Sequence, residues 1–105
     1  MSSTTVQAIN LEDEQITVLF NQHWFQEDIN TLHKLLLKNN SNIAIKEVII
    51  GADRENIRFH WLDTEFILNF ECYSQSCWLE MQQPRDISKT RDLFNLLSKN
   101  HTDHV

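Results

Sequence analysis

The middle of the chain alternates between apolar and polar positions in four short runs, a period typical of β-strands that are buried on one side. The runs are Ile45–Ile50, Ile57–Leu62, Phe66–Cys72 and Cys77–Gln82. Short polar gaps separate them, and a parallel crossover would need about a dozen residues or more. The pattern therefore predicts a four-stranded antiparallel meander.

Two further strands are predicted near the N-terminus. A β-branched, apolar run, Ile16–Phe20, follows a weaker alternating run, Thr4–Ile9. The polar segment 10–15 between them is typical of a turn, so the two runs predict a hairpin. This hairpin can join either edge of the meander, and the pattern does not choose between the edges.

Two segments, Asp28–Lys38 and Asp86–Lys99, have the period of an amphipathic helix instead. The apolar positions of the first segment recur at helical spacing: Phe25, Ile29, Leu32 and Leu36. The second segment has a similar stripe: Ile87, Thr90, Leu93, Phe94 and Leu97. Asp86 stands where an N-cap residue is expected. The predicted element order is β-β-α-β-β-β-β-α.

Antiparallel pairing about the predicted turns places the large apolar side chains on one face of the meander, because side chains alternate along a strand. The expected cross-strand pairs are Trp61 with Phe66, Phe59 with Leu68, Ile57 with Phe70, Phe70 with Leu79, Leu68 with Met81, Cys72 with Cys77, Ile50 with Ile57 and Val48 with Phe59. The two helices offer matching stripes to cover this face. We therefore expect an α+β fold, a two-layer sandwich of a mostly antiparallel sheet with two helices on one face.

The chain has 105 residues, which is the size of one domain, and no linker or internal repeat interrupts it. Apolar residues make up 41% of the sequence, and a single glycine and a single proline argue against a disordered chain. We expect one domain over residues 1–105, with an ordered core at about 5–99 and a flexible tail at 100–105.

The formal net charge of −6 disfavours nucleic acid and anionic membranes as partners, since both attract an excess of Lys and Arg. The N-terminal residues carry no basic, apolar signal segment, and no apolar run approaches the ~20 residues that cross a bilayer. We expect a cytoplasmic protein.

The six polar and aromatic residues expected on the opposite face of the meander are the candidate partner-binding residues: Arg58, His60, Asn69, Glu71, Trp78 and Glu80. Trp and Arg are the residue types that most often dominate binding energies at interfaces. Three interpretations of this face stay open. It is simply solvated, it is covered by the N-terminal hairpin or a second copy of the chain, or it binds another protein or a small ligand.

Cys72 and Cys77 are the other candidates for chemistry, and buried thiols, a cross-strand disulfide and a metal or catalytic thiol are the alternatives. Their C-x4-C spacing is not the C-x-x-C of redox and zinc sites. His60 is expected to lie across from Glu47, with Arg58 two residues away. Such cross-strand groups are ordinary surface stabilisation.

Glycine-rich phosphate loops, nucleophile elbows and H-E-x-x-H motifs do not occur in the sequence. We expect no enzyme, no catalytic residue, no metal site and no cofactor. The leading hypothesis is a protein-interaction or regulatory module that uses the face around Trp78. The alternative is a small-ligand or metal-binding protein that uses the hairpin of Cys72 and Cys77 together with His60, and a homodimer through the open faces is a third possibility.

The block Glu71–Glu80, with its Tyr73-Ser74 turn and its Trp78-Leu79-Glu80 strand, resembles a small bacterial family of uncharacterised proteins, domain of unknown function 3630. The resemblance implies a bacterial cytoplasmic protein with the same order of hairpin, helix, four strands and helix. It implies no activity and no site residue. Both cysteines stand where the family's pattern is not expected to have cysteine.

Overall fold

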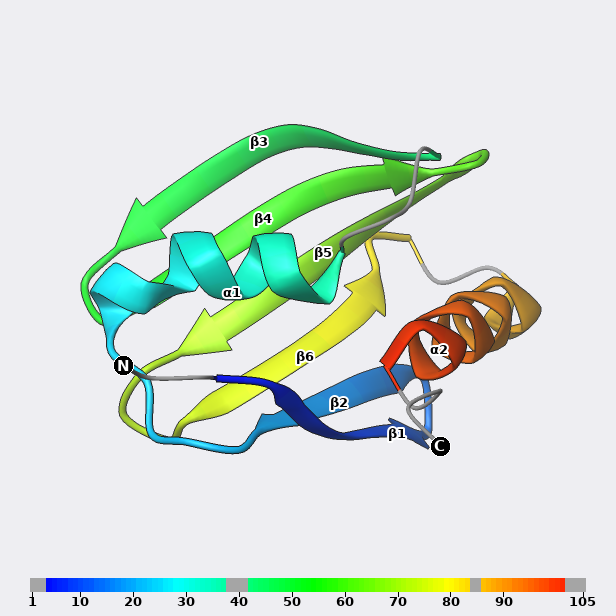
Figure 1. The fold of residues 1–105 in the computed structure, drawn as a ribbon. Helices are drawn as coiled ribbons and strands as arrows, with labels where there is room; N and C mark the ends of the chain where they lie inside the picture. The colour runs from blue at the N-terminus through cyan, green and yellow to red at the C-terminus, as the bar shows by residue number, and fades with distance from the viewer. Residues whose placement is uncertain (1–3, 38–41, 84–85, 102–105) are drawn as a thin grey trace.

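The computed structural model describes residues 4–37, 42–83 and 86–101, and within them a six-stranded antiparallel sheet carries two α-helices (Figure 1). The strands are β1 (Val6–Glu12), β2 (Gln15–Phe20), β3 (Ile43–Gly51), β4 (Arg54–Trp61), β5 (Thr64–Glu71) and β6 (Ser76–Met81). They lie in the order β1-β2-β6-β5-β4-β3. The N-terminal hairpin therefore extends the sheet beside β6, and the predicted α+β class and element order are confirmed.

Both helices contribute to one buried cluster on the same side of the sheet. A turn of 3-10 helix, η1 (Gln26–Asp28), leads into α1 (Ile29–Leu36), and α2 (Ile87–His101) follows the last strand. Their buried residues join the inward side chains of the strands in this cluster: Ile29, Leu32, Leu36, Leu93 and Leu97. In Figure 1, α1 lies in front of β4 and β5, whereas α2 packs on β1 and β2.

The start and the end of α2 are held by polar contacts. Asp86 accepts a hydrogen bond from the backbone N–H of Ser88 at 3.0 Å, which is the N-cap contact that the sequence predicts. At the other end, Nε2 of His101 donates to the carbonyl oxygen of Leu36 at 2.9 Å and ties α2 to α1. The helix thus includes two residues of the predicted tail, whose remainder, 102–105, lies outside the described residues.

Aromatic side chains fill the centre of the core. Phe59, Phe66 and Phe70 are fully buried, and the rings of Phe59 and Phe66 stack with centroids 5.6 Å apart. Trp24, in the loop after β2, meets Phe70 edge to face at 5.5 Å. Burial of a side chain of this size contributes about 1.5–3 kcal/mol.

In the described part of the chain, neither helix is long and apolar enough to cross a membrane.

The cross-strand register differs from the prediction by two residues. Phe59 pairs with Phe66, where Leu68 was expected, because the β4–β5 turn is at Leu62 and Asp63. In the next hairpin Phe70 pairs with Cys77, where Leu79 was expected. A two-residue shift keeps every side chain on its face, which is why the predicted apolar face is correct although its pairs are wrong.

Strand β3 also departs from expectation. Val48 pairs with Ile57 and Ile45 with Phe59, and the ladder between these two pairs contains a β-bulge at Lys46. Ile45 and Val48 share the face of the core yet are each 44% exposed. The two helices do not cover this edge strand in the way that the sequence suggested.

Candidate functional site

The six candidate residues all lie on the face of the sheet opposite the helices. We call this face the outer face and define it by the described residues Thr17, Leu19, Ile49, Asn56, Arg58, His60, Ile67, Asn69, Glu71, Trp78 and Glu80. Each candidate alternates along its strand with a buried core residue, such as Phe59 between Arg58 and His60. The hairpin β1–β2 does not cover the outer face but widens it.

Asn69 is the centre of a hydrogen-bond network that crosses three strands. It is only 5% exposed, although it lies on the outer face. Its Oδ1 accepts a hydrogen bond from Asn56 at 2.6 Å, and its Nδ2 donates to Glu80 at 3.0 Å. Nε1 of Trp78 donates to the same Glu80 oxygen at 3.2 Å. The network fixes the orientation of the Trp78 indole ring.

Ion pairs flank this network on two sides. Arg58 pairs with Glu47 on the neighbouring strand β3 and approaches Glu65 at 3.7 Å. Arg54 pairs with Glu71 at 2.6 Å. The pKa of Glu71 lies below its usual value, first because Ser74 donates a hydrogen bond to the carboxylate and second because of Arg54.

His60 is not where the sequence placed it. It lies opposite Ala44 and Glu65, and Arg58 is the residue that faces Glu47. The cause is the tight β3–β4 turn, in which Gly51 pairs with Arg54, so that Glu47 comes to face Arg58. The bulge at Lys46 then shifts the remaining pairs by one residue and sets Ala44 opposite His60.

A shallow groove of about 630 Å³ lies on the outer face where β2 and β6 meet. Its lining combines apolar side chains with carboxylates and hydroxyls: Gln15, Thr17, Val18, Leu19, Glu71, Ser74, Gln75, Ser76, Cys77, Trp78 and Glu80. Leu19 is 51% exposed, whereas Trp78 is half-buried. Three of the six candidate residues, Glu71, Trp78 and Glu80, are thus brought to one groove.

Sequence reasoning missed the contribution of β2 to this groove. Leu19 has the alternation of a strand residue opposite to the core residues Val18 and Phe20, so its face could be predicted. Its position beside Trp78 could not, because the hairpin had two possible edges to join. The pairing of Thr17 with Trp78 shows that the hairpin joins the edge of the meander formed by β6.

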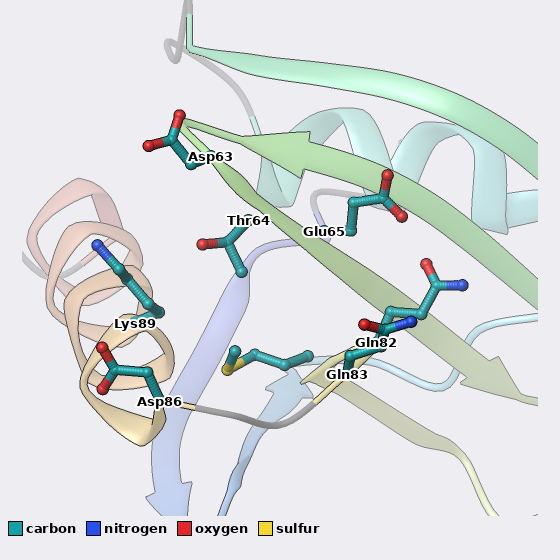
Figure 2. A pocket seen from close by; sticks show the side chains of 8 residues that line it. Asp63, Thr64, Glu65, Gln82, Gln83, Asp86 and Lys89 are labelled. Carbon is teal, nitrogen blue, oxygen red and sulfur yellow. The ribbon is translucent and has the colours of Figure 1, made fainter.

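A second, polar pocket lies at the far end of the sheet (Figure 2). It has a volume of about 460 Å³ between the β4–β5 turn and the start of α2, and its lining is Asp63, Thr64, Glu65, Met81, Gln82, Gln83, Asp86 and Lys89. The pKa of Asp86 lies below its usual value because the Ser88 hydroxyl and backbone N–H donate to it. That carboxylate is therefore engaged in capping α2.

The structure separates the residues of the alternative hypothesis. Cys77 faces the core opposite Phe70, and Cys72 lies in the turn after β5, where its N–H donates to the carbonyl of Asp53. The expected pairing of the two cysteines is wrong, and both are free thiols. Burial raises the pKa of Cys77 well above its usual value and also raises that of Cys72. His60 lies on the other face of the sheet, and the described residues contain no cluster of three metal-binding side chains.

Residues 6–99 of the chain match the family described as "Protein of unknown function (DUF3630)". The match covers all six strands, α1 and all but the last two residues of α2. No curated protein and no solved structure matches the chain.

Proposed function

The chain belongs to the DUF3630 family, and we propose that it is a non-enzymatic protein-interaction module of the bacterial cytoplasm that binds its partner through the outer face. The observation that carries the proposal is the groove in which Leu19 and Trp78 lie beside the carboxylates of Glu71 and Glu80. Large apolar side chains next to fixed polar groups are typical of binding surfaces.

The rigidity of this surface supports the proposal. Trp78 is held by its hydrogen bond to Glu80, and Glu80 is held by Asn69, whose side chain is almost fully buried. Trp78 therefore loses little side-chain entropy when a partner stacks on its indole ring. Arg54 and Arg58 are likewise held by ion pairs at the border of the outer face.

The charge of the groove indicates the chemistry of the partner. Glu80 accepts hydrogen bonds from an amide and an indole, neither of which neutralises its negative charge. The whole chain carries a net charge of −6. We infer a protein partner with Lys or Arg beside an apolar side chain, so that the cation meets Glu80 while the apolar group packs on Leu19 and Trp78.

The alternative function, a ligand or metal site at Cys72, Cys77 and His60, has no comparable support. A thiol becomes a strong nucleophile or metal ligand in its thiolate form, and burial disfavours that form at both cysteines. His60 also lies on the opposite face of the sheet from Cys77. We therefore retain the interaction module alone.

The proposal is tested by affinity capture from a bacterial lysate with four folded proteins: wild type, Leu19→Asp, Trp78→Ala and Ile87→Asp. Ile87 is 47% exposed at the start of α2, so its substitution matches that of Leu19 in chemistry but leaves the outer face intact. We expect a partner that wild type and Ile87→Asp retain and that the other two variants lose. Eluates that do not differ among the four proteins would contradict the proposal.

A further inference from the structure

The edge strand β3 presents apolar side chains and one unpaired backbone edge. It is the last strand of the sheet, and in the described residues it pairs with β4 alone. Ile45, Val48, Ile49 and Ile50 are 44%, 44%, 45% and 69% exposed. Long apolar edges invite pairing with another strand unless the protein blocks them. The sequence of β3 indicates which strand pairs with it.

The sequence of β3 is complementary to itself when it is read antiparallel. About a centre between Lys46 and Glu47, the strand Ile43–Gly51 would pair with a second copy as Ile43 with Ile50, Ala44 with Ile49, Ile45 with Val48 and Lys46 with Glu47. Each apolar residue meets an apolar residue, and each charge meets the opposite charge. Opposite charges at directly facing positions stabilise a strand pair, and like charges destabilise it.

The bulge at Lys46 makes this register consistent with the two faces of the sheet. Ile45 and Val48 both lie on the core face, although three residues in sequence would place them on opposite faces of a regular strand. The same holds for Ile43 and Ile50, which pair with Trp61 and Glu55. Because residues on one face direct their backbone groups to the same side of a strand, the free edges of both copies also match.

We propose that two copies of the chain associate through antiparallel pairing of β3 with β3 and form one continuous sheet across a two-fold axis. The axis is perpendicular to the sheet, so the helices of both copies lie on one side and both outer faces lie on the other. Ile43, Ile45, Val48 and Ile50 of each copy then lie together on the core side of the joined sheet. The dimer makes no use of Leu19 or Trp78, so dimerisation and partner binding are separable.

Proteins also use bulges and lysines to protect edge strands from pairing. Charge substitutions at Lys46 and Glu47 distinguish such a protected edge from a dimer interface. In the dimer, Lys46→Glu places two glutamates opposite each other at each of two symmetric positions. Glu47→Lys places two lysines there in the same way. Each variant alone is expected to weaken the dimer about tenfold or more. A mixture of the two variants restores opposite charges at both positions.

The experiment is sedimentation equilibrium from about 5 to 500 µM protein, a range that covers weak one-strand interfaces. The control is Lys89→Glu, the same charge change at an exposed position on α2. We expect dimers for wild type and control, dimers weakened about tenfold or more for Lys46→Glu and Glu47→Lys, and a heterodimer when these two are mixed. Circular dichroism verifies that each variant is folded.

Wild type that stays monomeric at the highest concentration would overturn the proposal. So would a wild-type dimer that neither charge variant weakens, because that dimer would use another surface. Val48→Lys gives a second reading, since this half-exposed side chain meets Ile45 of the other copy and carries little of the monomer core. A Val48→Lys dimer as tight as the wild-type dimer would also overturn the proposal.

Discussion

At the scale of single residues, the turns of the sheet are unusual because they use left-handed backbone without glycine. Among the described residues, four have a positive φ, and each lies in a turn between strands: Asp13, Asp53, Leu62 and Gln75. Aspartate tolerates this conformation, whereas for leucine it costs about 1–2 kcal/mol. Leu62 is also 57% exposed, so its side chain regains little of this cost by packing.

Leu62→Gly should therefore stabilise the protein by about 0.5–1 kcal/mol in urea unfolding, because glycine adopts φ 56° without steric cost. The matched control is Leu19→Gly, a comparably exposed leucine within β2, which should lose about 1 kcal/mol. Equal losses of stability in the two variants would contradict this account of the β4–β5 turn.

His33 gives the protein a pH dependence that can be predicted in sign. Burial, and to a lesser extent Lys34, lowers the pKa of His33 below its usual 6.5. Well above pH 6.5 the ring is neutral in both the folded and the unfolded state, so its protonation does not affect stability. As the pH falls through 6.5 and toward the lower pKa of the folded state, the unfolded chain binds the proton more readily, so stability is lost.

The free energy of unfolding should thus decline between about pH 7 and pH 5 more steeply for wild type than for His33→Gln. Urea titrations at several pH values measure both slopes. Parallel slopes would mean that the folded chain protonates His33 as easily as the unfolded chain does.

At the scale of elements, the loop after β2 is held to the β5–β6 turn by one side chain. Gln75 accepts a hydrogen bond from the backbone N–H of Trp24 at 3.0 Å. Its Nε2 donates to the carbonyls of Trp24 and Cys72 at 2.8 and 3.0 Å. These contacts position Trp24, whose ring packs on Phe70, and they border the groove of the outer face.

Gln75→Glu should cost about 1–3 kcal/mol, because the carboxylate keeps the acceptor but loses both donors and faces two carbonyl oxygens. Gln22→Glu adds the same charge at an exposed position and serves as the control. Thermal melts compare the two. A loss of stability no greater than that of the control would show that the Gln75 contacts are not needed.

The elements also show how far the sequence could lead. All six strands and both α-helices were predicted, most of them from their period, because local spacing of apolar residues determines which face is buried. The registers were not, since Leu62 and Cys72 look like strand residues yet belong to turns. The sequence also could not place Leu19 beside Trp78, because the joining of β2 to β6 depends on contacts far apart in the chain.

At the scale of the whole molecule, the two faces of the sheet differ in structure. The core face buries the aromatic cluster under α1 and α2, whereas the outer face holds a polar network that fixes Trp78. The six candidate residues were predicted to share this face, and they do. Their role in binding a partner remains the proposal made above, in which Leu19 joins them.

The most direct test is isothermal titration calorimetry of the captured partner against wild type, Leu19→Asp and Ile87→Asp. The account predicts that Leu19→Asp weakens binding by about tenfold or more, because a carboxylate replaces an exposed apolar side chain in the lining of the groove. Ile87→Asp should bind like wild type. Equal affinities for all three proteins would place the binding surface elsewhere on the molecule and contradict the account.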